Sequence, residues 1–391
     1  QQASTEAMDY RNKKILAPMV RAGTLPFRQL ARSYGADLVY SEELIDKKLV
    51  KCERTVNETL GLVEFRCNGA LVFATPPSET SVVCQIGTAD ATTALAAATV
   101  VANDVAAIDI NMGCPKRFSV HCGMGAALLT KPQTVKEILS TLVRNLSLPV
   151  TCKIRLLDTT VATLDLIRTI EQTGVSALAI HARQIPERPR DPAHWDELAL
   201  LTPGRTVPII ANGDIYTPED IVKVREQTGV DSVMIARGAL KNPAIFSDGP
   251  MPDLHDCIRE YLKLSCDCSN IYQNTKWAIG EMLDLNGLQK GEHSLKLQSA
   301  RSLRELCAIW DVEDHYSDTL ERLGMKELGG GAGKRKRAAS VAIAQGGKAR
   351  PEAIGSHEED HGGQQQQLGA HLERGAQASG EACGSVARAE E

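Results

Sequence analysis

The stretch PVTCKIRLLDTTVATLDLIRTIEQTGVSALAIHAR at residues 149–183 decides the fold. It opens with the strand-like run 149–156 and closes with a second run at 177–183, whose first four residues are all apolar. Between them, residues 163–174 have the spacing of an amphipathic helix that ends on a glycine. Continuous apolar strands are typical of a parallel sheet buried on both faces. The stretch therefore predicts a strand–helix–strand unit.

The same unit recurs on both sides of this stretch. Eight apolar runs, each followed by a helical pattern, lie at residues 13–20, 36–42, 81–87, 105–113, 149–156, 177–183, 208–214 and 231–237. Eight such units predict an α/β fold, the (β/α)₈ TIM barrel. The alternative is a doubly wound open sheet, but APMVRAG after the first strand lacks its glycine fingerprint. The overlong second unit, 44–80, predicts an inserted helix and a small hairpin.

The pattern changes after the eighth unit. We expect an N-terminal extension at 1–12, the barrel at 13–250, a small all-helical domain at 251–325 and a disordered tail at 326–391. The tail has no aromatic residue and is rich in Gly, Ala, Glu and Gln, so it buries too little apolar surface to fold. Its basic run Lys334–Arg337 is either a nuclear-entry signal or solvated charge.

Composition excludes several classes of protein. The formal net charge of −5 argues against a globally basic nucleic-acid binder but leaves room for a local basic surface. The eleven cysteines include no C-x-x-C pair, so we expect no metal site and a reduced, cytoplasmic protein. No apolar run is long enough to span a membrane. The N-terminal residues lack the apolar core of a secretion signal, and we expect none.

Polar residues cluster where the predicted strands end, which is the active-site face of a barrel. The turns ANGD at 211–214 and ARGAL at 236–240 follow strands seven and eight, where barrels often bind phosphate. Lys153 and His181 end neighbouring strands and would project into the mouth. From the residues alone, Lys153 is either a Schiff-base lysine or a cation beside an electron-rich ring such as a reduced flavin.

Cys114 stands between a glycine and a proline, directly after the fourth predicted strand. A free cysteine in a protein is most often an inert, buried residue. A thiol is also an acid that is neutral at working pH and able to release its proton. Both interpretations remain open from the spacing alone.

The strand-end motifs resemble those of the tRNA-dihydrouridine synthases, over roughly residues 13–325. They are APM, DINMGCPK followed by GMGAALL, CKIR, HAR, ANGD and MIARGAL. VRAGTLPFRQLARSYGADLVYSEELIDKK is most similar to the eukaryotic cytosolic branch that modifies uridine 20 of tRNA. The resemblance implies a barrel with a C-terminal helical domain, FMN as cofactor, NADPH or NADH as reductant, and tRNA as partner of a monomeric enzyme.

The resemblance also assigns roles to residues. Cys114 would protonate C5 of the uridine. The cofactor would be bound by Pro18, Met19, Val20, Gln85, Lys153, His181, Asn212, Gly213, Asp214, Ala236 and Arg237, the last five at its phosphate. Substrate contacts would come from Asn111, Lys116, Arg117 and Arg183. Cys84, Cys122 and Cys152 are expected to be structural.

Two features depart from the family pattern. Animal members of this branch carry a double-stranded-RNA-binding domain after the helical domain, and the tail here lacks the aromatics for one. Ala182 stands where relatives often have glycine. Two alternative functions follow: a flavin-dependent dihydroorotate- or dihydropyrimidine-type oxidoreductase acting on a free pyrimidine, or a catalytically silent RNA-binding scaffold.

Overall fold

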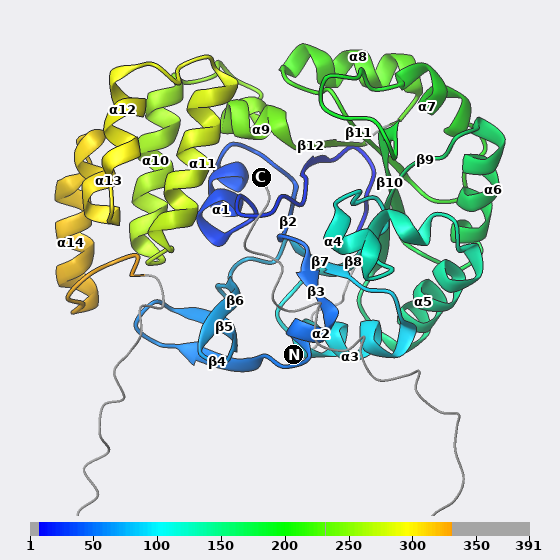
Figure 1. The fold of residues 1–391 in the computed structure, drawn as a ribbon, viewed down its shortest axis with the longest axis horizontal. Coiled ribbons are helices and arrows are strands. Elements are labelled where there is room, and N and C mark those ends of the chain that lie inside the picture. Colours follow the sequence, from blue (N-terminus) through cyan, green and yellow to red (C-terminus); the bar gives the residue numbers. More distant parts are fainter. Residues whose placement is uncertain (1–7, 231, 331–391) are drawn as a thin grey trace, which may run out of the picture. The chain divides into compact units, whose positions relative to one another are not determined.

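Eight parallel strands form a closed barrel in the computed structural model, which describes residues 8–230 and 232–330 (Figure 1). In chain order they are β1 (Lys14–Leu16), β2 (Leu38–Tyr40), β7 (Val82–Gly87), β8 (Ala107–Asn111), β9 (Val150–Leu156), β10 (Ala177–Gln184), β11 (Ile209–Asn212) and β12 (Ser232–Ile235). Each strand pairs with the next, β2 pairs with β7, and β1 pairs with β12 to complete the ring. The predicted TIM barrel is confirmed, and the open sheet is excluded.

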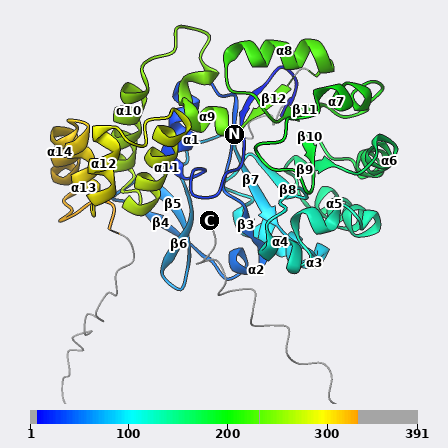
Figure 2. The same ribbon diagram turned by 45° about the horizontal axis from the view of Figure 1, so that its top comes forward.

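Helices cover the outside of the barrel, between successive strands (Figures 1 and 2). They are α1 (Leu25–Ser33), α3 (Ala91–Val101), α5 (Pro132–Asn145), α6 (Thr160–Glu171), α7 (Trp195–Leu201), α8 (Pro218–Thr228) and the short α9 (Arg237–Lys241). Local sequence fixes their ends. Thr217 and Asp220 form a reciprocal capping box at the start of α8, and Gly229 ends that helix in the left-handed conformation.

The barrel strands are buried on both faces, as their apolar composition predicts. One cluster of buried side chains, including Ile15, Tyr40, Ala179 and Met234, fills the barrel interior. A larger cluster lies between the strands and the surrounding helices. Successive residues of a strand point to opposite sides, so each strand contributes to both clusters.

The insertion in the second unit holds more structure than its sequence predicts. The expected helix and hairpin are present as α2 (Asp46–Leu49) and as β5 (Leu62–Cys67) with β6 (Ala70–Thr75). Asn68 and Gly69 connect β5 to β6 with positive φ angles of 50° and 77°, as a tight hairpin turn requires. Two further strands accompany them. The exposed β4 (Glu53–Asn57) pairs with β5, and the two-residue β3 (Leu44–Ile45) pairs with β7.

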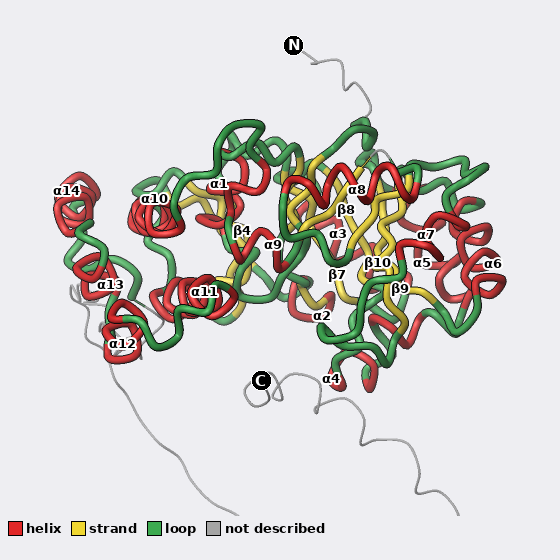
Figure 3. Tube along the Cα trace, turned by 90° about the horizontal axis from the view of Figure 1, so that it is seen from above, coloured by secondary structure: helices red, strands yellow, loops and turns green. Residues whose placement is uncertain are grey.

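In the described part of the chain, five helices follow the barrel, and the first of them lies beside α1 (Figure 3). They are α10 (Leu254–Asp267), α11 (Tyr272–Leu285), α12 (Glu292–Ser299), α13 (Leu303–Ile309) and α14 (Glu313–Leu323). The rings of Phe27 on α1 and Tyr261 on α10 pack edge to face with centroids 5.8 Å apart, and both are fully buried. Asn286, after α11, donates to the carbonyl of Lys241 on α9 at 2.7 Å. The helical region therefore contacts both the first and the last helix of the barrel.

Some expectations concern residues beyond those described. Residues 1–7, Lys334–Arg337 and nearly all of the predicted tail lie outside the described residues. The domain limits 13–250 and 251–325 stay predictions. No helix among the described residues is both long and apolar enough to cross a lipid bilayer.

Candidate active site

Strand alternation brings the predicted site residues into the mouth of the barrel. Val83, Ala107, Ala179, Ile210 and Met234 belong to the interior cluster, which fixes the inward side of their strands. Two residues further along, the same side carries Gln85, Asp109, His181, Asn212 and Ala236. The carboxyl ends of five strands thus present polar or small side chains to one space.

A buried chain of side-chain hydrogen bonds crosses β7, β8 and β9. Asp109 accepts from Gln85 Nε2 at 2.9 Å and from the Thr151 hydroxyl at 2.7 Å. Gln85 Oε1 in turn accepts from Asn111 Nδ2 at 3.2 Å. Burial raises the pKa of Asp109 to about 6, while the two donors and Lys153 act against that rise. The chain holds Gln85 and Asn111 in one orientation each.

Cys114 occupies a tightly built loop between β8 and the short helix α4 (Arg117–His121). The backbone N–H of Cys114 donates to Asn111 Oδ1 at 3.0 Å, and the backbone carbonyl of Cys114 accepts the N–H of Ala126 at 3.0 Å. A Cβ on Gly125 would lie 2.6 Å from that carbonyl, so only glycine fits there. Burial, and then the charge of Glu43, raise the pKa of Cys114 to about 11. Cys114 is therefore a neutral thiol at pH 7.

Lys153 and His181 carry perturbed acid–base properties. Burial, followed by the charge of Arg155, lowers the pKa of Lys153 to about 8. Burial and then the charges of Lys153, Arg155, Arg183 and Arg237 hold the pKa of His181 far below its usual range. At neutral pH, the site thus pairs a cationic lysine with a neutral imidazole.

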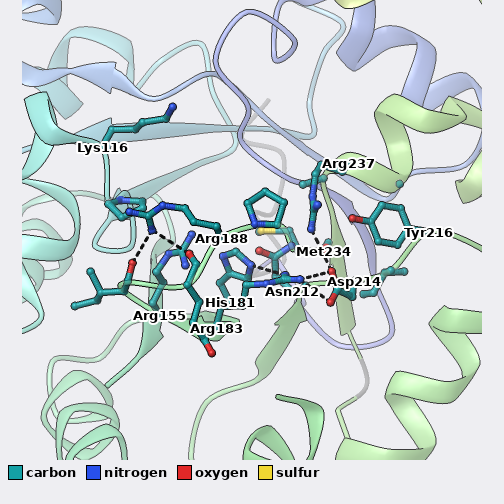
Figure 4. A pocket seen from close by; sticks show the side chains of 18 of the residues that line it. Lys116, Arg155, His181, Arg183, Arg188, Asn212, Asp214, Tyr216, Met234 and Arg237 are labelled. Carbon is teal, nitrogen blue, oxygen red and sulfur yellow. Dashed lines mark hydrogen bonds and ion pairs between the residues drawn. The ribbon is translucent and has the colours of Figure 1, made fainter. Parts of the chain in front are cut away.

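The turns after β11 and β12 form a charged cluster around Asp214 (Figure 4). Nη2 of Arg183 donates to both oxygens of the Asp214 carboxylate, at 2.5 and 2.6 Å, and the Arg183 side chain is only 2% exposed. Arg237 donates to the same carboxylate at 3.1 Å. Gly213 has φ +123°, and a Cβ there would lie 3.2 Å from the His181 ring. Glycine therefore keeps the space beside His181 open.

A cavity of about 820 Å³ opens beside this cluster. Of the predicted site residues, the structure places His181, Asn212, Gly213, Asp214, Ala236, Arg237, Lys116, Arg117 and Arg183 in its wall. Pro18, Met19, Val20, Gln85, Asn111, Cys114 and Lys153 are not in that wall, although Pro115, the neighbour of Cys114, is. The wall holds six basic side chains, Lys116, Arg117, Arg155, Arg183, Arg188 and Arg237, against the two carboxylates Glu187 and Asp214. Such a wall suits an anionic ligand.

Further wall residues had no individual role assigned to them from the sequence. Tyr216 lies beside Arg237, whose guanidinium is 5.2 Å from the centre of its ring. Arg188 and Glu187 enter the wall from the loop after β10, and Arg155 projects from β9 to the carbonyl of Gly113 at 2.9 Å. Arg155 and Arg188 had a sequence signal, because one ends a strand and the other lies in the arginine-rich loop 183–190. Tyr216 had none.

The family model described as "Dihydrouridine synthase (Dus)" matches residues 15–302. A Schizosaccharomyces pombe protein named tRNA-dihydrouridine(20) synthase [NAD(P)+] is 38% identical over 80% of this chain and 67% of its own length. The Saccharomyces cerevisiae protein of the same name is also 38% identical, over 70% of this chain and 78% of its own. A mouse protein named tRNA-dihydrouridine(20a/20b) synthase [NAD(P)+]-like is 34% identical over 78% of this chain and 89% of its own length.

Proposed function

Because this chain belongs to the dihydrouridine synthase family, we propose that it reduces the C5–C6 double bond of a uridine in the D-loop of tRNA, at position 20. The reductant is NADPH or NADH, and FMN is the cofactor. The observation that carries the proposal is the basic cavity at the carboxyl ends of β10, β11 and β12, next to the loop that holds a neutral Cys114 thiol.

The residues of the cavity fit a flavin mononucleotide. About 820 Å³ is within the range of cofactor pockets, roughly 300–1,000 Å³. Arg237 and the open backbone at Gly213 supply charge and space for a phosphate. Lys153, His181 and Gln85 are assigned to the polar edge of the ring, and Pro18, Met19 and Val20 to its face. When bound and reduced, the flavin would supply a hydride to C6 of the uridine.

Cys114 is proposed to hold the proton that C5 receives. Its thiol stays protonated at working pH because burial raises its pKa, and the Asn111 side chain fixes its backbone. Lys153 is charged below about pH 8 and is proposed to stabilise negative charge on the reduced ring. The neutral His181 adds no competing charge.

The substrate contacts are proposed at the rim. Lys116 precedes α4, and Arg117 is its first residue. Both side chains are exposed and border the cavity, so they can contact phosphates of the RNA. A uridine inside folded RNA must be extruded to reach a buried site, and Asn111 and Arg183 are assigned to its recognition. Both of these side chains also bond within the chain, Asn111 to Gln85 and Arg183 to Asp214.

One experiment tests the proposal. The purified chain, loaded with FMN, is incubated with NADPH and unmodified tRNA, and dihydrouridine is measured by mass spectrometry of the digested tRNA. We expect product at position 20 in the wild type and none in Cys114→Ala, which should retain its flavin absorbance. Cys67→Ala removes a partly exposed thiol of β5 and serves as the matched control.

Four outcomes would contradict parts of the proposal. Full product formation by Cys114→Ala would exclude Cys114 as the acid. Failure to bind FMN would remove the cofactor. Turnover of free uracil derivatives without turnover of tRNA would favour the free-pyrimidine oxidoreductase, and flavin binding without any turnover would favour the silent scaffold.

A further inference from the structure

Glu43 is a buried carboxylic acid at the mouth of the barrel that the proposed chemistry leaves unused. It lies between β2 and β3, beside the end of β7. A Cβ on Gly87, the last residue of β7, would come within 2.5 Å of Glu43 Oε1, so this glycine makes room for the carboxyl group. Oε1 is buried and has no hydrogen-bond partner within the described part of the chain. Burying an unpaired carboxyl oxygen costs folding free energy, so its presence here needs an explanation.

The group that faces Glu43 is the thiol of Cys114. The two side chains are close enough that each alters the pKa of the other. The buried hydroxyl of Ser119 lies close to the same loop, because a Cβ on Gly125 would come within 2.6 Å of Ser119 Oγ and 3.0 Å of Cys114 Cβ. Because Asn111 and Gly125 fix the Cys114 backbone, the thiol can take few positions.

Three other charged side chains lie near this pair, Lys153, Arg155 and Glu42. Lys153 and Arg155, both on β9, interact electrostatically with Cys114. Glu42, the chain neighbour of Glu43, accepts the backbone N–H of Arg21 at 2.5 Å. Cys114 is thus the titratable group that affects Glu43. Burial raises the pKa of Glu43 itself to about 7. Near neutral pH the Glu43 carboxyl is therefore protonated in a large fraction of molecules.

The position of Cys114 poses a chemical difficulty that Glu43 resolves. A thiol with a pKa near 11 is a weak acid, and releasing its proton would leave a thiolate in a poorly solvated site. A protonated carboxyl next to the sulfur stabilises the developing negative charge and can replace the lost proton. The negative charge then resides on Glu43, which is the stronger acid of the two.

We propose that Glu43 is a positioning residue that stands behind Cys114 and resupplies its proton. This inference rests on the proposed function. As the S–H proton moves to C5 of the uridine, the O–H proton of Glu43 moves to Sγ. The thiol is restored, and Glu43 is left as a carboxylate. Glu43 then takes a proton from solvent, so one proton is consumed for each uridine reduced.

The first test is the pH dependence of a single turnover. Enzyme reduced by NADPH without oxygen is mixed with unmodified tRNA, and flavin reoxidation is followed by absorbance. A group that must be protonated is active below its pKa, so the wild-type rate should fall as pH rises through about 7. Glu43→Gln cannot transfer a proton. Its rate at pH 6 should be about 10- to 100-fold lower, without the inflection near 7.

Two variants control this test. Glu43→Asp keeps a carboxyl group and should restore part of the rate together with the inflection. Glu42→Gln makes the same chemical change one residue away and should keep the inflection, because Glu42 interacts with Arg21 rather than with Cys114. A Glu43→Gln enzyme with the wild-type rate and the wild-type inflection would overturn the proposal.

The second test does not depend on turnover. Alkylation of Cys114 by iodoacetamide is measured by peptide mass spectrometry between pH 6 and pH 10, because only the thiolate reacts. Removing the carboxylate should lower the thiol pKa, so Cys114 in Glu43→Gln should react about three to ten times faster at pH 8.5. Equal alkylation profiles would exclude coupling between the two side chains. If the wild type fails to oxidise its flavin with tRNA, the proposed function fails, and alkylation alone decides the coupling.

Discussion

The side-chain oxygen of Asn111 accepts the backbone N–H of Cys114 at 3.0 Å, and it also accepts that of Gly113 at 3.0 Å. Asn111 can present this oxygen to the loop because its amide nitrogen is bound to Gln85, which is itself oriented by Asp109. A carboxylate accepts and cannot donate, so Asp109 sets the direction of both amides. The position of the thiol is thus fixed from the interior of the barrel.

Asn111→Ala should therefore damage both stability and turnover. One buried and one partly buried N–H group lose their acceptor, which costs about 1–3 kcal/mol of unfolding free energy. The rate of dihydrouridine formation should fall at least tenfold, because the thiol loses its fixed position. Asn111→Asp keeps the acceptor oxygen and should lie between the wild type and Asn111→Ala in urea denaturation. An unchanged rate in Asn111→Ala would show that the loop needs no such anchor.

Asp214→Asn should destabilise the fold strongly. Arg183 is almost fully buried, and Asp214 is its ion-pair partner, so the substitution leaves a buried guanidinium without a counter-charge. We expect a loss of about 3–5 kcal/mol in the free energy of unfolding, measured by urea denaturation. Asp165→Asn breaks an exposed ion pair with Arg168 on α6 and should cost less than about 1 kcal/mol. Similar losses in the two variants would contradict this account.

Lys153→Met should stabilise the protein in a pH-dependent way. The folded pKa of Lys153, about 8, lies below the ordinary value of 10.5, so burying the charged form opposes folding at pH 7. This cost is fully present below about pH 8 and disappears as pH rises to about 10.5. The urea midpoint of Lys153→Met should exceed that of the wild type at pH 7, and the gap should close towards pH 10.5. Lys51→Met, at an exposed lysine, should show no such change of the gap with pH.

Lys116→Ala and Arg117→Ala should weaken tRNA binding chiefly at low salt. If each side chain contacts one phosphate, each substitution should reduce the slope of log affinity against log salt by about one, between about 50 and 200 mM salt. Lys136→Ala, on the outer helix α5, should leave the slope unchanged. Filter binding of unmodified tRNA provides the measurement. Equal slopes in all three variants would remove Lys116 and Arg117 from the RNA interface.

The barrel could be predicted from sequence because its strands are buried on both faces and its helices have a clear period. Residues 53–57 escaped prediction for the opposite reason. This strand, β4, is mostly exposed and carries Glu, Arg and Thr, so no apolar pattern marks it. Strand β3 has only two residues, too few for any period. Both are held in place by their neighbours β5 and β7 rather than by their own sequence.

Much of the candidate site also follows from sequence, because barrel strands present their ends to one mouth. Gln85, His181 and Asn212 are examples of residues at strand ends that the fold brings together. The position of Glu43 is marked in this way, because it follows the second predicted strand, but its partner is not, and Tyr216 is not marked at all. Each lies in a loop, and its role depends on which groups the fold places opposite it, Arg237 for one and Cys114 for the other. Asp109 is marked only by strand alternation, two residues before Asn111.

The contacts of Tyr261 with Phe27 and of Asn286 with Lys241 join the helices after residue 250 to both sides of the seam where β1 meets β12. These helices therefore pack against both sides of the β1–β12 closure of the barrel and help to hold it together. A protein ending near residue 250 would leave the apolar surface around Phe27 open to water. Two fragments produced by a cut between η2 (Pro243–Phe246) and α10 would each carry half of this surface, which favours their reassociation.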